Sequence, residues 1–71
     1  MSELSLASIE RIIHKAGAER VSMNAIVAMS DVLEDICVDI SKESVKLAKH
    51  VKRKTVKKED IKLAVKRIPI S

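Results

Sequence analysis

Residues 23–51 read MNAIVAMSDVLEDICVDISKESVKLAKHV and contain neither Gly nor Pro. Apolar residues recur in this stretch in steps of three, four and seven, as they do on one face of an α-helix. They are Ala25, Met29, Leu33, Ile36, Ile40 and Leu47. The pattern predicts one helix of about 28 residues, which at 1.5 Å per residue is about 42 Å long.

This long helix carries a second apolar line on its opposite side, made of Val27, Val38 and Val45. Two short flanking helices of the same chain are too small to cover both lines along their whole length. A chain of 71 residues also forms only a marginal core by itself. We therefore expect a second copy of the chain to cover the long helix. The predicted dimer core comprises Met29, Leu33, Ile36 and Ile40.

A short helix is predicted ahead of the long one. Apolar residues at i, i+3, i+4 and i+7, counted from Ile9, indicate a helix that begins at about Ser5 or Ser8 and ends at Lys15. Gly17 can adopt the left-handed conformation that ends a helix. Ser22 is a good N-cap for the long helix, so a short loop connects the two.

A second short helix is predicted after a loop at residues 52–55. Its apolar stripe consists of Ile61, Ala64, Val65 and Ile68, and Pro69 ends it. Glu59 and Asp60 lie in its first turn, where the helix dipole favours carboxylates. The sequence thus predicts an all-α fold in one domain of residues 1–71, with the order short helix, loop, long central helix, loop, short helix.

Charge is segregated along the chain. Residues 46–71 carry ten Lys or Arg against Glu59 and Asp60, a net charge of +8, whereas residues 1–45 sum to −4. So basic a C-terminal third is typical of a protein that binds a polyanion, usually nucleic acid. The chain has no Phe, Tyr or Trp, and proteins that bind single strands usually stack bases on aromatic rings. The sequence therefore favours duplex DNA as the partner.

Other function classes find no support in the residues. The sequence shows no nucleophile with a base, no catalytic carboxylate pair and no glycine-rich phosphate loop, so we expect neither an enzyme nor a small-molecule substrate. Cys37, His14 and His50 lack metal-ligand spacing, and we expect no metal and no cofactor. A lone cysteine and the lack of an eighteen-residue apolar run predict a soluble protein of a reducing compartment, with no membrane partner.

Several strings of residues carry a resemblance to a known family. They are Arg11-Ile12-Ile13, Ala16-Gly17-Ala18-Glu19-Arg20-Val21-Ser22, Lys46-Leu47-Ala48-Lys49-His50, Arg53-Lys54-Thr55-Val56-Lys57 and Glu59-Asp60-Ile61-Lys62-Leu63-Ala64-Val65. Over nearly its whole length the chain resembles the archaeal histones, which are a minimal histone fold without tails. The resemblance implies a handshake dimer, in which two chains cross head to tail and each first loop pairs with the partner's second loop.

The resemblance also implies where DNA is bound. Its DNA-contact positions correspond to Arg11 in the first helix, Arg20 in the first loop, and Lys54 with Thr55 in the second loop. These side chains suit phosphate, because Arg offers a planar fork, Lys a point charge and Thr a hydroxyl donor. Binding is then expected to depend on how readily the DNA bends rather than on its base sequence.

Two further sets of residues follow from the resemblance. Arg53 and Asp60 are expected to form a structural ion pair. Dimers are expected to join into tetramers or larger stacks through a four-helix bundle made by Leu47, His50, Asp60 and Leu63. The implied function is that of a chromatin protein that bends, wraps and compacts double-stranded DNA largely without sequence specificity. Its implied location is the chromosome, or nucleoid, in the cytoplasm.

Two alternatives remain open. The chain could pair with another histone paralogue and serve in protein heterodimerisation, with a role mainly through protein partners, as in transcription factors. A plain antiparallel coiled coil with an incidental basic end is the other, but it leaves both matching loops unexplained. The chain also departs from the family pattern. Lys52 replaces a usual glycine, Glu10 places a carboxylate beside Arg11, and Asp31 and Val38 stand where positive charge is common.

Overall fold

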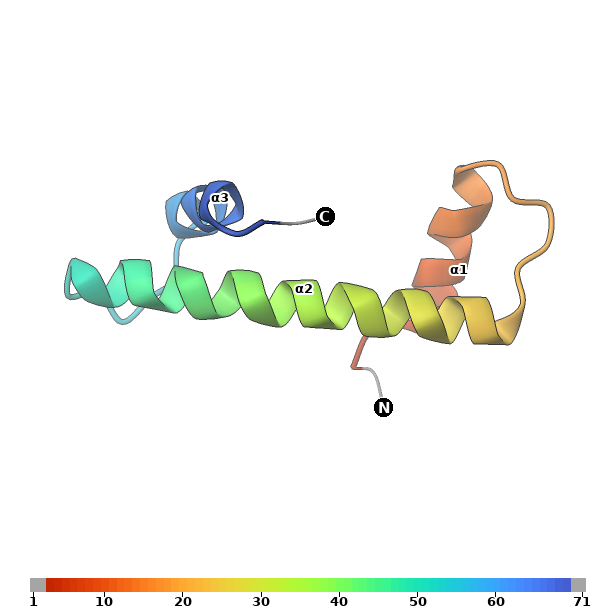
Figure 1. Cartoon of the computed structure of the whole chain (residues 1–71), viewed down its shortest axis with the longest axis horizontal. Coiled ribbons are helices and arrows are strands. Elements are labelled where there is room, and N and C mark those ends of the chain that lie inside the picture. The colour runs from red at the N-terminus through yellow and green to blue at the C-terminus, as the bar shows by residue number, and fades with distance from the viewer. Residues whose placement is uncertain (1–2, 70–71) are drawn as a thin grey trace. The chain divides into compact units, whose positions relative to one another are not determined.

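The computed structural model describes residues 3–69, and within this range it contains three α-helices and no strand. Helix α1 is Leu6–Lys15, α2 is Met23–His50 and α3 is Lys58–Arg67 (Figure 1). This order confirms the predicted all-α class and its succession of a short, a long and a short helix. The two residues at each end of the predicted 1–71 domain lie outside the described residues.

The chain divides into two compact units, Met1–Asp35 and Ile36–Ser71, with the boundary inside the continuous helix α2. In the first unit α1 packs against the N-terminal half of α2. The buried residues of this first unit are Ile9 from α1 and Ile26 and Ser30 from α2. In addition, the backbone N–H of Glu3 donates to the Glu34 carboxylate at 3.0 Å, which ties the start of the chain to α2.

The ends of the helices in this first unit follow from local side chains. The Ser5 hydroxyl accepts a hydrogen bond from the N–H of Ser8 at 3.3 Å and caps α1. Gly17 follows α1 with φ of +114°, the left-handed conformation predicted for it. The Ser22 hydroxyl accepts from the N–H of Ala25 at 3.1 Å, so the predicted N-cap of α2 is confirmed.

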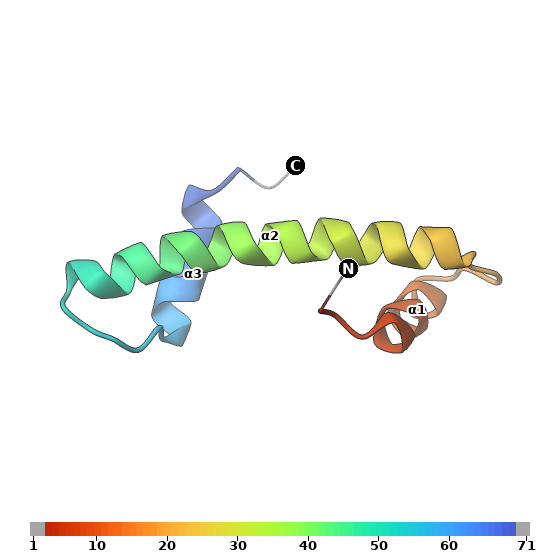
Figure 2. The same ribbon diagram turned by 90° about the horizontal axis from the view of Figure 1, so that it is seen from below.

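In the second unit α3 crosses the C-terminal half of α2, as the two views of the ribbon show (Figures 1 and 2). The buried side chains here are mostly small. They include Ser44 and Ala48 of α2 and Ala64 of α3. The Ser44 hydroxyl donates to the carbonyl of Ile40 at 2.7 Å and lies 3.5 Å from the carbonyl of Asp60. This hydroxyl satisfies its own hydrogen-bonding capacity while it joins α2 to the first turn of α3.

Helix α2 ends in a Schellman motif centred on Lys52. The N–H of Arg53 donates to the Ala48 carbonyl and the N–H of Lys52 donates to the Lys49 carbonyl, both at 2.9 Å. These are the two hydrogen bonds that define the motif. Lys52 has φ of 60°, the left-handed conformation that favours glycine. The lysine at this position therefore keeps the turn at the expense of backbone strain.

Replacing Lys52 with glycine is expected to raise the free energy of unfolding by about 1 kcal/mol, because glycine adopts the left-handed conformation without a steric penalty. Urea unfolding followed by circular dichroism measures the change. The matched control is Lys42→Gly within α2, where the same replacement should lower the free energy by about 1 kcal/mol. A lower stability of Lys52→Gly would show that the lysine side chain itself stabilises the turn.

Candidate nucleic-acid interface

The predicted DNA contacts of the first unit are Arg11 and Arg20. Arg11 lies in α1 and Arg20 in the loop between α1 and α2, and both side chains are exposed. Within the described part of the chain no carboxylate forms an ion pair with either guanidinium. Both cations are therefore available to an external anion.

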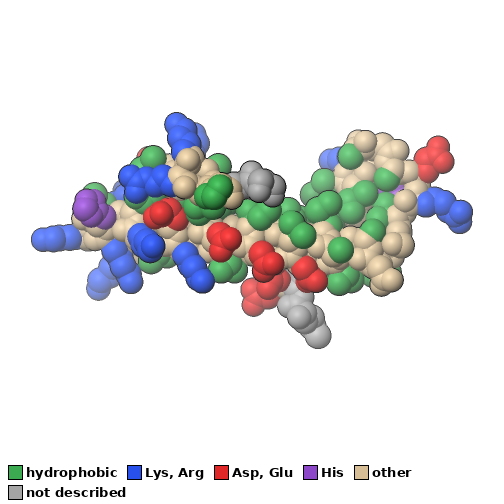
Figure 3. All heavy atoms as spheres, in the orientation of Figure 1, with side chains coloured by type: hydrophobic (Ala, Val, Ile, Leu, Met, Phe, Trp, Pro, Cys, Tyr) green, Lys and Arg blue, Asp and Glu red, His purple; other side chains and the backbone are tan. Residues whose placement is uncertain are grey.

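The predicted contacts of the second unit lie in the loop between α2 and α3. Lys54 and Thr55 are consecutive exposed residues of this loop. The Thr55 carbonyl accepts a hydrogen bond from the Arg53 guanidinium at 3.0 Å, so its own backbone is held in place. Lys and Arg side chains gather around the C-terminal half of α2 and around α3 (Figure 3). This part of the molecule presents the strongest positive charge.

The predicted ion pair between Arg53 and Asp60 is present in the structure. The guanidinium donates through Nη1 at 2.8 Å and Nη2 at 2.9 Å, one to each carboxylate oxygen. Asp60 is only 5% exposed and also accepts the backbone N–H of Lys57 at 2.8 Å, which caps the start of α3. Since Arg53 also reaches the carbonyl of Thr55, one buried carboxylate indirectly positions the loop that carries Lys54.

These contacts change the acidity of Asp60. The hydrogen bonds from Arg53, and then the backbone N–H of Lys57, lower the pKa of Asp60 from 3.8 to about 2. A carboxyl group whose pKa is lower in the folded state stabilises the fold above its unfolded pKa, and this stabilisation is lost as the pH falls through the folded value. The contribution of Asp60 is thus complete above about pH 4 and disappears between pH 3.8 and about 2.

Substituting Asp60 with asparagine is expected to lower the thermal midpoint of unfolding at pH 7. The substitution removes the negative charge that accepts hydrogen bonds from the Arg53 guanidinium and the backbone N–H of Lys57. The difference from the wild type should shrink as the pH is lowered toward 2, where wild-type Asp60 becomes protonated. Glu59→Gln, a neutralisation of the exposed neighbouring acid, is the matched control and should have little effect. A difference that stays constant over pH would contradict the electrostatic role of Asp60.

His14 lies between a carboxylate and the first loop. Its Nδ1 is 2.9 Å from the carbonyl oxygen of Ala18, and its Nε2 is 3.5 Å from the Glu10 carboxylate one turn earlier in α1. The Ala18 carbonyl and then Glu10 raise the pKa of His14 above its ordinary value of 6.5. The i, i+4 spacing of Glu10 and His14 is visible in the sequence, but the contact with Ala18 depends on how the loop folds.

An NMR titration of the two histidines is expected to give His14 a pKa above 6.5. Because this pKa is raised by folding, the protonated imidazole stabilises the fold below pH 6.5, and the effect is lost as the pH rises through the folded pKa. Glu10→Gln should lower the His14 pKa only in part, since the Ala18 carbonyl is the larger cause. An unchanged His14 pKa in a variant with a shortened first loop would contradict this assignment.

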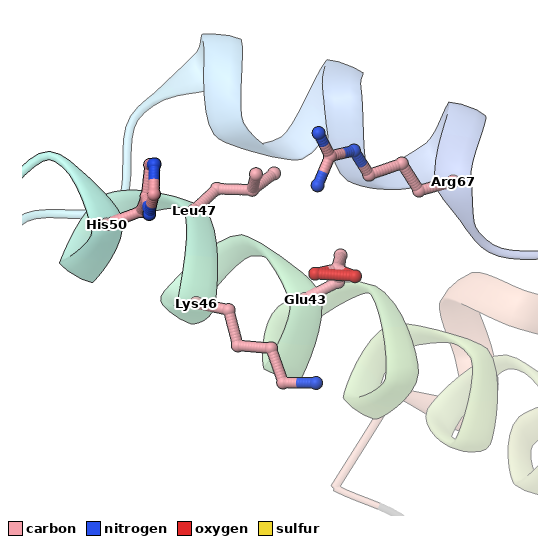
Figure 4. A pocket seen from close by; sticks show the side chains of 5 residues that line it. All are labelled: Glu43, Lys46, Leu47, His50 and Arg67. Atoms are coloured by element: carbon pink, nitrogen blue, oxygen red, sulfur yellow. The ribbon is translucent and has the colours of Figure 1, made fainter.

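The four residues predicted to join dimers all belong to the second unit. Leu47 is half-buried, His50 is exposed, Leu63 is 42% exposed and Asp60 is buried. Leu47 and His50 line a cavity of about 350 Å³ between α2 and α3 (Figure 4). The other residues that line it are Glu43, Lys46 and Arg67, none of which was predicted as a site residue. Asp60 and Leu63 do not line this cavity.

The predicted dimer core lies on α2 and is incompletely covered by the chain itself. Met29 is 41% exposed and Leu33 39%, whereas Ile36 and Ile40 are half-buried. Further large apolar side chains of α2 are exposed as well. They are Met23, Val27, Val32, Val38 and Val45. This amount of exposed apolar surface along one helix is typical of a protein-protein interface.

Some observations concern other kinds of site. No helix in the described part of the chain is both long enough and apolar enough to cross a membrane. Among residues 3–69, no three His, Cys, Asp or Glu side chains gather as metal ligands would. Cys37 is exposed and is not part of a disulfide.

Comparisons with known proteins identify the family. Residues 2–65 match the model of the family described as histone-like transcription factor (CBF/NF-Y) and archaeal histone. The match spans most of the chain, and the chain therefore belongs to this family. The three-helix structure agrees with a histone fold, and the resemblance noted in the sequence is confirmed.

Two relatives from archaea cover almost the whole chain. One of them, a subunit of the archaeal histone HAN1 from Thermococcus zilligii, is 50% identical over 66 residues, which are 93% of this chain and 98% of the relative. Probable archaeal histone 3 of Methanocaldococcus jannaschii is 52% identical over 66 residues, with the same shares of both chains. The similarity thus extends through both loops and all three helices.

Proposed function

We propose that this chain is a chromatin protein that binds double-stranded DNA through its two loops and α1. The observation that carries the proposal is the exposure of Arg11, Arg20 and Lys54, cations that no carboxylate of the described chain neutralises, on a protein of the histone family. Arg and Lys at such positions bind phosphate oxygens, and Thr55 adds a hydroxyl donor. These groups recognise the DNA backbone and deformable sequences rather than particular bases.

The DNA-binding species is proposed to be a handshake dimer. The exposed side chains of Met29 and Leu33 and the half-buried Ile36 and Ile40 provide the apolar surface that a second α2 would cover. In a head-to-tail arrangement, the first loop of one chain lies beside the second loop of its partner. Arg20 of one protomer and Lys54 of the other then form one composite phosphate-binding site. The single domain predicted for residues 1–71 is completed only in this dimer.

Larger assemblies are proposed to form through the face that contains Leu47, His50, Asp60 and Leu63. The half-buried Leu47 and the exposed Leu63 supply an apolar centre for such a contact. Successive dimers joined in this way along a duplex would bend, wrap and compact it. We place this activity on the chromosome in the cytoplasm, and we propose no catalytic role.

The proposal is tested by measuring the mass of the purified protein alone and on a long duplex of random sequence. Binding is repeated over a series of salt concentrations, because each phosphate contact adds about 0.9 to the slope of log K against log salt. Free dimers that accumulate on DNA with a steep salt dependence are the expected result. Folded dimers without measurable duplex affinity would contradict the proposed function.

One observation favours a second candidate, a chain that pairs with a different histone-fold protein. A relative that is 50% identical is named as one subunit of a histone, and the matching family includes histone-like transcription factors. Sedimentation of the purified chain distinguishes the two candidates. A chain that folds and dimerises alone supports the homodimer, whereas a monomer that folds only after a second histone-fold protein is added supports the heterodimer.

A further inference from the structure

We propose that Glu43 and Arg67 form reciprocal ion pairs between two dimers and thereby make the dimer-dimer junction specific for a second copy of this chain. The inference rests on the proposed function, because it concerns the face that contains Leu47 and His50. It identifies the charged partners at this face, and neither of them was among the residues predicted to join dimers.

The cavity beside Leu47 brings these two charges close to the same surface. Figure 4 shows Glu43 rising from α2 toward α3, while the side chain of Arg67 extends back from the end of α3 toward Leu47. Lys46 extends away from α3 in the same view. In the described part of the chain no ion pair engages Glu43 or Arg67. Both charges line an open cavity of about 350 Å³ and can accept a partner from outside.

Asp60 is poorly suited to provide the intermolecular charge. Its carboxylate is 5% exposed, and both of its oxygens accept hydrogen bonds from Arg53, with a further one from the N–H of Lys57. Binding to a partner's histidine would have to compete with these contacts. Glu43 is more accessible than Asp60, and among residues 3–69 no ion pair engages its carboxylate. The junction therefore has a free acid at Glu43 and a free guanidinium at Arg67.

Symmetry selects a second copy as the partner. In a two-fold contact, the residue pairs occur twice, so that Glu43 of each dimer meets Arg67 of the other. A surface with one acid and one base is complementary to itself in this arrangement. Arg and a carboxylate form a geometrically specific, bidentate pair, and Leu47, which lines the same cavity, would help to exclude water from it. Duplex DNA fits this face less well, since Glu43 would repel phosphate.

The test uses two charge reversals in the full-length protein, Glu43→Arg and Arg67→Glu, with assembly measured by sedimentation in solution and on a long duplex. Each variant alone places like charges opposite each other twice, and its dimer-dimer association should be at least tenfold weaker while its dimers still bind DNA. An equal mixture of the two variants should assemble again, because both contacts become complementary. The double variant should assemble by itself for the same reason.

Leu47→Lys is the control, because it should block assembly in every background, including the mixture, and leave DNA-binding dimers. The thermal midpoints of all variants establish that the dimers remain folded. Rescue by the double variant without rescue in the mixture would overturn the proposal, since it would place the pair within one chain. Unchanged assembly of both single variants would also overturn it. Wild-type dimers that fail to bind duplex would instead contradict the proposed function.

Discussion

Alanine at both Arg20 and Lys54 is expected to reduce duplex affinity about a hundredfold or more near 0.1 M salt. In the proposed homodimer each substitution occurs twice, so four of the proposed phosphate contacts are removed. Every lost contact should flatten the dependence of log K on log salt by about 0.9. Because the affected contacts are to phosphate, the loss should be similar on all sequences. Fluorescence anisotropy with two unrelated duplexes over a salt series measures both effects.

The matched control for this variant is alanine at both Lys42 and Lys62, two exposed lysines in α2 and α3 that are not among the proposed contacts. It removes the same number of charges from the protein. An equal loss of affinity in the control would show that only net charge matters. Loss of the dimer in the Arg20 and Lys54 variant would show instead that these loop residues hold the fold together.

Introducing glutamate at Leu33 is expected to raise the dissociation constant of the dimer about a thousandfold or more. The side chain is 39% exposed in one chain and lies in the proposed dimer core. A two-fold interface would bury two unpaired carboxylates, each at a cost of at least about 2 kcal/mol. Because tenfold in affinity corresponds to about 1.4 kcal/mol, the two together reach about a thousandfold. Sedimentation and circular dichroism over a protein concentration series measure the loss.

Lys42→Glu places a glutamate at an exposed polar position of the same helix and should leave the dimer intact. The comparison separates an effect of burial from an effect of negative charge on α2. A Leu33→Glu protein that dimerises as tightly as the wild type would contradict the proposed interface, and Met29, Ile36 and Ile40 would then need another explanation.

The helices could be predicted from the sequence because their boundaries depend on local residues. Gly17 and Ser22 act through their own backbone and side chain, so their roles were predictable without a three-dimensional structure. The Arg53 and Asp60 pair was expected only from the family resemblance, since a spacing of seven across a loop does not define a contact. The further hydrogen bond that the backbone N–H of Lys57 donates to Asp60 is likewise visible only in the structure.

Other features depend on how helices pack and could not be predicted. The cavity that Glu43 and Arg67 line lies between α2 and α3, and 24 positions of sequence separate the two charges. His14 meets Ala18 because the loop after Gly17 turns back toward α1. In both cases the sequence lists the residues, but only the tertiary structure shows that they lie near each other.

The chain has two compact units whose boundary falls inside α2, so contacts within each unit can form before any contact with a second chain. The hydrogen bond from Ser44 in α2 to the carbonyl of Asp60 in α3 spans only 16 positions of sequence, and local contacts of this kind form rapidly. In the proposed dimer, the exposed apolar side chains of α2 are covered only after two chains meet. We therefore expect the folded fraction to rise with the abundance of the chain, and unpaired chains to be degraded first.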